Sequence, residues 1–196
     1  MVMNRAVFLD RDGTINVELE FLHRPEDFHF IPGAPQAIRL LNEAGFRVIV
    51  VTNQSGIARG YYDEAAVRRL HRYMDAQLAP FDAHIDAYYF CPHHPEHGSE
   101  EYRKSCACRK PMDGMLRRGA AEFALDLSAS FMIGDRLVDV AAGLKAGCLP
   151  MLVRTGYGAA EAAGLPPGVP VYADLPEAVG VIVSGDDRLL QNRNMF

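Results

Sequence analysis

The sequence has no long hydrophobic run. Among its 196 residues, no apolar stretch approaches the roughly 20 residues that a membrane-spanning helix needs. The apolar run near the N-terminus is short and is interrupted by Asp10, which argues against a signal peptide. Both absences favour a protein that works in the cytoplasm without a membrane partner.

Basic clusters are also missing. The 20 Lys and Arg residues face 25 Asp and Glu residues, which gives a formal net charge of -5, and no basic block stands out. A nucleic-acid-binding surface is therefore not expected. A small anionic substrate stays compatible with this charge, because a few local cations are enough to bind it.

Internal repeats and low-complexity linkers are absent as well. The length favours one domain, and the composition, 49% hydrophobic and 23% charged, is that of an ordinary globular protein. We expect a single domain over residues 1–183, without a separate cap domain, and a tail of uncertain structure over residues 184–196. The expected oligomeric state is a monomer.

Cysteine is scarce but clustered. Three of the four cysteines, Cys91, Cys106 and Cys108, fall within 18 residues, whereas Cys148 stands apart on a helical stretch and is interpreted as a core residue. In a reducing compartment such a cluster indicates a metal site more often than a disulfide. The pairs Cys-Pro-His and Cys-Ala-Cys, separated by twelve residues, have the spacing of a tetrahedral zinc site with three thiolates and one imidazole.

The imidazole of this site is open to alternatives, because His94 and His97 lie close to His93. We choose His93, since Cys-x-His mirrors Cys-x-Cys. Four protein ligands leave no open position, so zinc in the loop over residues 91–108 would be structural. The alternative is a set of free thiols in a mobile loop.

Apolar runs alternate with helical patterns along the chain. The predicted strands cover residues 6–10, 46–52, 84–91, 130–135 and 149–156, with a last short strand and helix within 171–183. The predicted helices cover residues 34–44, 63–79, 112–126 and 136–147, and Asp63 is a suitable N-cap. This alternation predicts an α/β fold with a doubly wound, mostly parallel sheet.

Polar residues follow four of these strands. They are Asp10-Arg11-Asp12-Gly13-Thr14, Thr52-Asn53-Gln54-Ser55-Gly56, Arg109-Lys110-Pro111 and Gly134-Asp135-Arg136. In a parallel sheet the carboxyl ends of the strands meet at one edge, where ligands bind. We therefore expect these groups to converge on one site.

Three acids, a hydroxyl and a lysine at one site are the groups that phosphoryl transfer needs. One carboxylate can act as the nucleophile, and a second can protonate the leaving alkoxide and then deprotonate water. Such carboxylates repel one another unless a cation lies among them, and Mg²⁺ prefers oxygen ligands.

These residues carry a resemblance to a known family. Asp10-x-Asp12-Gly13-Thr14, Thr52, Lys110 and Gly134-Asp135 resemble the four motifs of the haloacid dehalogenase (HAD) superfamily of phosphatases. NQSGIARGYY (53–62), the Cys/His loop running into CRKP, and LVRTG (152–156) resemble its heptose-1,7-bisphosphate phosphatases, with the histidinol-phosphatase branch as close kin. The resemblance covers roughly residues 5–158.

The resemblance implies a HAD-like Rossmannoid fold and a role for each matching residue. Asp10 is implied as the nucleophile and Asp12 as the general acid/base. Asp10, the backbone carbonyl of Asp12 and Asp135 are implied as Mg²⁺ ligands. The implied substrate and phosphate ligands are Thr52, Asn53, Arg109 and Lys110. The zinc ligands Cys91, His93, Cys106 and Cys108 also match the family pattern.

The implied activity is hydrolysis of the 7-phosphate of D-glycero-D-manno-heptose 1,7-bisphosphate through an aspartyl-phosphate, in the route to bacterial surface polysaccharide. A histidinol-phosphate phosphatase and a non-catalytic zinc-stabilised binding module remain as alternatives.

The chain departs from the broad superfamily at Arg136, where many members carry a second acid, and Asp139 is not taken as a metal ligand. The segment 16–30 has no clean periodicity, and we expect it to form a flap over the site. His23 and Arg24 on this flap are weaker candidates for substrate contact.

Overall fold

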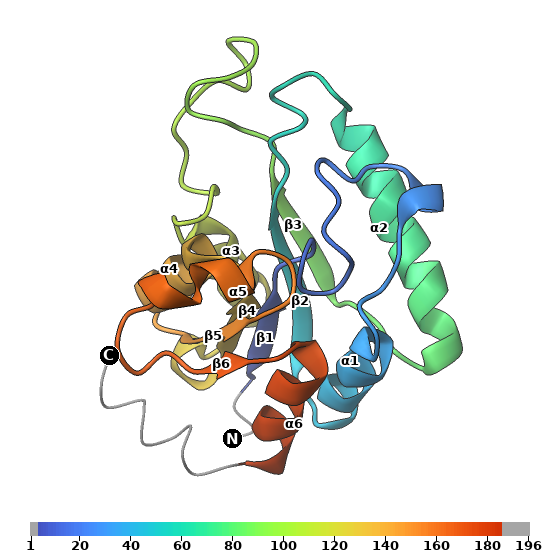
Figure 1. Cartoon of the computed structure of the whole chain (residues 1–196), viewed down its shortest axis with the longest axis vertical. Helices are drawn as coiled ribbons and strands as arrows, with labels where there is room; N and C mark the ends of the chain where they lie inside the picture. The colour runs from blue at the N-terminus through green and yellow to red at the C-terminus, as the bar shows by residue number, and fades with distance from the viewer. Residues whose placement is uncertain (1–3, 186–196) are drawn as a thin grey trace.

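The computed structural model describes residues 4–185, and within them six strands form one parallel sheet (Figure 1). The strand order is β3-β2-β1-β4-β5-β6, and each neighbouring pair is parallel. The bounds are β1 Ala6–Leu9, β2 Arg47–Asn53, β3 Ala87–Cys91, β4 Phe131–Gly134, β5 Leu149–Val153 and β6 Val171–Tyr172. The predicted α/β fold with a doubly wound sheet is confirmed.

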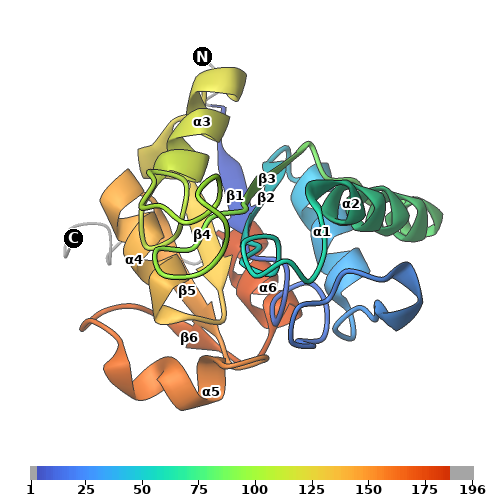
Figure 2. The ribbon, with the colours of Figure 1, turned by 90° about the horizontal axis from the view of Figure 1, so that it is seen from above.

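Helices cover both faces of the sheet (Figure 2). They are α1 Ala34–Glu43, α2 Glu64–Leu78, α3 Gly114–Phe123, α4 Leu137–Ala146, α5 Gly158–Glu161 and α6 Leu175–Ser184. α1, α2 and α6 pack on one face, and α3 and α4 on the other. Within residues 4–185, no helix is long and apolar enough to cross a membrane.

The central strand β1 is enclosed on both faces. Val7 and Leu9 pack in the layer beneath α1, α2 and α6, and Ala6 and Phe8 pack in the layer beneath α3 and α4. All four side chains are fully buried. Because close-packed interiors move little, the residue that follows this strand, Asp10, has a fixed position.

The structure corrects several predicted boundaries. β3 begins at Ala87 rather than at residue 84, and α3 covers Gly114–Phe123 rather than 112–126. α5 has no counterpart among the predicted helices, because four residues are too few to show a helical period. Asp63 caps α2 as predicted, since its Oδ1 accepts a hydrogen bond from the backbone N–H of Ala66. The predicted tail lies, from residue 186 on, outside the described residues.

Candidate active site and metal centre

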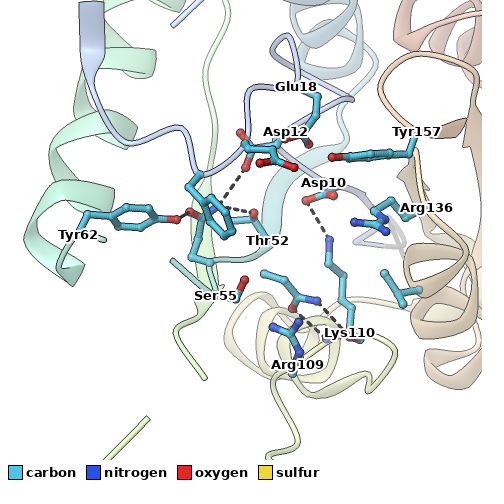
Figure 3. Close-up of a pocket in the computed structure, with 15 residues that line it drawn as sticks. Asp10, Asp12, Glu18, Thr52, Ser55, Tyr62, Arg109, Lys110, Arg136 and Tyr157 are labelled. Atoms are coloured by element: carbon cyan, nitrogen blue, oxygen red, sulfur yellow. Dashed lines mark hydrogen bonds and ion pairs between the residues drawn. The ribbon is translucent and has the colours of Figure 1, made fainter. Parts of the chain in front are cut away.

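The predicted site residues meet at the carboxyl edge of the sheet. Asp10 follows β1, Thr52 lies in β2, Asp135 follows β4, and Lys110 comes from the long loop after β3. Asp10, Thr52 and Lys110 border a cavity of about 370 Å³, which Figure 3 shows in close-up. The predicted residues that line it directly are Asp10, Asp12, Thr52, Asn53, Arg109 and Lys110. The expected convergence of strand ends is therefore present in the structure.

Asp10 is almost entirely buried and is held at one oxygen. Its Oδ1 accepts a hydrogen bond from the backbone N–H of Arg11 at 2.7 Å and lies 2.9 Å from Lys110 Nζ. Both of these contacts fall on Oδ1, so within residues 4–185 Oδ2 is the oxygen left to approach a phosphorus atom. One oxygen of the carboxylate is thus held in place, while the other takes part in neither contact.

Lys110 is buried among oxygens. Besides Asp10, its Nζ contacts Asp139 Oδ1 at 2.6 Å and donates a hydrogen bond to the backbone carbonyl of Val51 at 2.8 Å. Burial alone disfavours the charged ammonium, but the carboxylates of Asp10 and Asp139 outweigh it and raise the pKa of Lys110. The side chain therefore supplies a permanent positive charge at the cavity wall.

Asp135 and Asp10 form the core of an acidic cluster suited to a cation. Together with Asp139 they bring carboxylate oxygens within 4.8 Å of one another. Burial is the main cause that raises the pKa of Asp10 to about 7 and that of Asp135 to about 8, and the neighbouring carboxylates add to it. Asp135 Oδ2 accepts a hydrogen bond from the backbone N–H of Tyr157, whereas Oδ1 has no hydrogen-bond partner within residues 4–185.

Such a buried, unpartnered oxygen among other carboxylates fits a divalent cation such as Mg²⁺, which binds oxygen ligands. Asp139 has other partners, because it contacts Lys110 and accepts a hydrogen bond from the backbone N–H of Arg136. Asp10 and Asp135 are therefore the two side chains best placed to hold the cation.

Asp12 points its carboxylate toward the cavity and is held by three side chains. Arg11 donates to both of its oxygens, with the shortest contact 2.9 Å. Asn16 donates to Oδ1 and Gln54 donates to Oδ2, each at 3.0 Å. The Arg11 side chain is fully buried, so its charge is committed to this one carboxylate.

Asn53 and Arg109 connect the segment that carries Lys110 to neighbouring parts of the chain. The Asn53 amide donates to the Lys110 carbonyl and accepts from the Lys110 N–H, at 3.0 and 3.1 Å. Arg109 donates to the backbone carbonyl of His93 at 3.0 Å. Asn53 thus fixes the backbone of the lysine, and Arg109 links the cavity to the Cys/His loop.

The four predicted zinc ligands lie together. The sulfur atoms of Cys91, Cys106 and Cys108 and Nδ1 of His93 are within 4.8 Å of one another, and the closest sulfur pairs are 3.2 Å apart. The hydrogen bond between Cys108 and Cys91 is the main cause that lowers the pKa of the Cys108 thiol to about 5 and raises the pKa of the Cys91 thiol. Since thiolates are the metal-binding form, this donor set suits zinc. His94 instead accepts hydrogen bonds from two nearby backbone N–H groups.

The residues that line the cavity but were given no role from the sequence include Glu18, Tyr62 and Tyr157. Gln54 and Arg136 also line it, and they were expected only as part of the polar groups at the strand ends. Burial, with the charges of Asp12 and Asp10, raises the pKa of Glu18 to about 7. The segment 16–30 borders the cavity through Glu18, Glu20 and Phe21, as expected of the predicted flap. His23 stacks on the Tyr62 ring, and Arg24 directly precedes the short 3₁₀ helix Pro25–Asp27 without a capping hydrogen bond from its side chain.

Comparison with known proteins gives consistent matches. The family model for haloacid dehalogenase-like hydrolases matches residues 7–79, and a second, HAD-hydrolase-like model matches residues 107–178.

Two curated relatives are both named D-glycero-beta-D-manno-heptose-1,7-bisphosphate 7-phosphatase. The protein of Photorhabdus laumondii is 46% identical over 89% of this chain and 94% of its own length. The protein of Escherichia coli strain K12 is 48% identical over 77% of this chain and 80% of its own length.

A solved structure is also similar. It is the D,D-heptose 1,7-bisphosphate phosphatase from B. bronchiseptica, complexed with magnesium and phosphate, with a TM-score of 0.85 and 38% identity. The match covers 92% of this chain and 99% of that one.

Proposed function

The chain belongs to the haloacid dehalogenase-like hydrolases and is a phosphoric monoester hydrolase, and from this we propose that it removes the 7-phosphate of D-glycero-D-manno-heptose 1,7-bisphosphate with the help of Mg²⁺. The observation that carries the proposal is the pairing of Asp10 with Lys110 at the cavity, backed by Asp135. Two curated relatives named for this reaction, at 46% and 48% identity, support the choice of substrate.

In the first step of the proposed reaction, Asp10 Oδ2 attacks the phosphorus of the 7-phosphate. The bond between phosphorus and the sugar oxygen breaks, and Asp12 gives its proton to that oxygen. Lys110 and the Thr52 hydroxyl lie at the cavity wall, where they would neutralise and orient the phosphate oxygens. The products are the heptose 1-phosphate and an aspartyl-phosphate on Asp10.

In the second step, Asp12 takes a proton from water, whose oxygen attacks the phosphorus of the aspartyl-phosphate. The bond to the Asp10 oxygen breaks, inorganic phosphate leaves, and both aspartates return to their starting protonation states. One residue therefore serves first as an acid and then as a base, which requires that its carboxyl group reach the same side of the phosphorus in both steps.

Asp10 and Asp135, with the backbone carbonyl of Asp12, would hold the Mg²⁺. When bound, this ion would supply positive charge that keeps the buried carboxylates ionised and offsets the charge of the phosphate. The raised pKa values of Asp10 and Asp135 and the unpartnered Asp135 Oδ1 support this assignment.

Two arginines support the recognition of a second phosphate. Arg109 and Arg136 both line the cavity, so a bisphosphate held at Lys110 would have guanidinium groups within its surroundings. We assign the distal part of the substrate to Arg109. Arg136 is held by Glu161 at 3.1 Å and lies over the Tyr157 ring.

We further propose that zinc occupies the cluster of Cys91, His93, Cys106 and Cys108 as a structural ion. The mutual distances of the four ligand atoms and the lowered pKa of Cys108 support this. Because Arg109 and Lys110 follow the last of these ligands directly, the ion would fix the start of the segment that carries the lysine.

The test of the proposed function is phosphate release by the wild-type protein with Mg²⁺. Heptose 1,7-bisphosphate, heptose 1-phosphate and histidinol phosphate are compared at equal concentration. We expect a kcat/KM for the bisphosphate well above those for the other two. A preference for histidinol phosphate would move the enzyme to the related branch, and equal rates on the two heptose phosphates would contradict the choice of the 7-phosphate.

A further inference from the structure

Gln54 connects the proposed acid/base residue to a second part of the chain. Its side-chain Nε2 donates to Asp12 Oδ2 at 3.0 Å and to Thr52 Oγ1 at 2.9 Å. Arg11 and Asn16, the other residues that hold Asp12, belong to the same turn as Asp12, whereas Gln54 follows β2. Gln54 thus links the position of Asp12 to that of Thr52, the proposed phosphate ligand in β2.

The orientation of the Gln54 amide is fixed by Tyr62. The Tyr62 hydroxyl donates to Gln54 Oε1 at 2.8 Å, and Gln54 is only 2% exposed. The amide oxygen therefore faces a donor while the amide nitrogen faces two acceptors, and the reverse orientation would leave buried groups mismatched. Figure 3 shows the dashed contacts that end at Asp12 and Thr52, with the Tyr62 hydroxyl beside them.

Tyr62 is itself held in place. His23 of the flap stacks on its ring, with the ring centroids 4.8 Å apart. A Cβ at Gly56 would lie 2.6 Å from the Tyr62 hydroxyl oxygen. The Tyr62 ring therefore packs directly on the Gly56 backbone, in space that a side chain at position 56 would fill. The hydroxyl of Tyr62 therefore has little freedom to move away from Gln54.

We propose that Gln54 is a positioning residue, oriented by Tyr62, that holds the Asp12 carboxyl group where it delivers the proton to the leaving oxygen. The inference rests on the proposed function, because it assigns to Asp12 the role of acid in that reaction. Neither residue is given a bond-making role, and the protons and electron pairs move as described above. Gln54 contributes only by holding the Asp12 carboxyl group in position.

This role predicts an effect that depends on the leaving group. A poor leaving group needs the proton of Asp12 when its bond to phosphorus breaks, whereas a good one departs as a stable anion. Misplacing Asp12 therefore slows hydrolysis of a poor leaving group more. A residue that only packs, or that only contacts the sugar, would not change this dependence.

The experiment compares phenyl phosphate with p-nitrophenyl phosphate, two esters without sugar that differ in leaving-group basicity. The quantity measured is kcat/KM. It reports the steps up to the departure of the leaving group and does not depend on hydrolysis of the aspartyl-phosphate. The variants are Gln54→Met, which keeps the volume but loses the donor, and Tyr62→Phe, which keeps the ring but loses the hydroxyl. Tyr61→Phe is the matched control, because Tyr61 is the adjacent residue and is 57% exposed.

We expect Gln54→Met to raise the ratio of p-nitrophenyl to phenyl kcat/KM by about tenfold, since general acid catalysis contributes at least that much. Tyr62→Phe is expected to raise it by about threefold, because the amide keeps its donor but loses its orientation. Tyr61→Phe leaves the ratio unchanged. If Gln54→Met does not fold, Tyr62→Phe carries the test.

An unchanged ratio in Tyr62→Phe and in any folded Gln54→Met would overturn the proposal, as would an equal rise in Tyr61→Phe. This failure differs from failure of the proposed function. A wild-type enzyme that hydrolyses the aryl esters but not the heptose bisphosphate would refute the substrate and leave the leaving-group test intact. A wild-type enzyme that hydrolyses no phosphate ester would refute both.

Discussion

The substitution Gly13→Ala tests how tightly the acidic cluster is built. Gly13 has a φ of +79°, in the left-handed region that favours glycine. A Cβ placed there would lie 2.6 Å from Asp135 Cγ and 3.2 Å from its Oδ1. Carbon atoms in contact are about 3.5–4.0 Å apart, so the Asp135 carboxylate would have to move by about 1 Å.

Two effects follow from this geometry. The backbone conformation costs about 1–2 kcal/mol of unfolding free energy when the residue carries a Cβ. The displaced carboxylate costs activity, because an error of about 1 Å in a catalytic group lowers rates by about 100-fold. We therefore expect Gly13→Ala to be folded, less stable, and nearly inactive in phosphate release at saturating Mg²⁺.

Gly45→Ala is the matched control for the free-energy cost of the left-handed backbone conformation. Gly45 follows α1 with a φ of +76°, and a Cβ there would meet no atom within 4 Å. This variant should lose a similar 1–2 kcal/mol, about what the left-handed conformation costs, in denaturant unfolding but keep the wild-type kcat. Full activity in Gly13→Ala, or an equal loss of activity in Gly45→Ala, would refute the view that Gly13 makes room for Asp135.

Other variants test the surroundings of Lys110. Asn53→Ala should lower the unfolding free energy by about 1–2 kcal/mol, because two hydrogen bonds to the Lys110 backbone are lost. The variant should also have a lower kcat. A wild-type unfolding free energy in urea titration together with a wild-type kcat for phosphate release would count against this. Cys106→Ser should reduce zinc, measured by elemental analysis, from about one ion per chain to a small fraction, since structural zinc needs four ligands, while Cys148→Ser should keep it. Removal of Mg²⁺ by a chelator should abolish phosphate release, and added Mg²⁺ should restore it; activity that persists without divalent ions would contradict the role given to Asp135.

The parts of the fold that the sequence predicted are those with local signals. β1, β2 and α2 follow from a continuous apolar run, a β-branched run and the Asp63 cap, and the structure has all three. The convergence of strand ends followed from topology alone, because parallel strands carry their carboxyl ends to one edge.

Contacts between distant segments could not be predicted in this way. The pairing of Lys110 with Asp139 joins the loop after β3 to α4, and nothing in either segment indicates the other. The contacts of Gln54 with Asp12 and Tyr62 are of the same kind, although all three residues lie in motifs that the sequence made prominent. A motif indicates that a residue matters, whereas its partner is known only when the chain is folded.

The role of Asp10 as the nucleophile is tested most directly by phosphate release from Asp10→Asn. Heptose 1,7-bisphosphate is supplied with saturating Mg²⁺, and thermal unfolding checks that the variant is folded. An amide oxygen is too weak a nucleophile to replace a carboxylate, so the rate should fall by at least about 1,000-fold, as expected when the attacking group of a covalent mechanism is removed. A folded Asp10→Asn protein that releases phosphate within tenfold of the wild-type rate would contradict the mechanism.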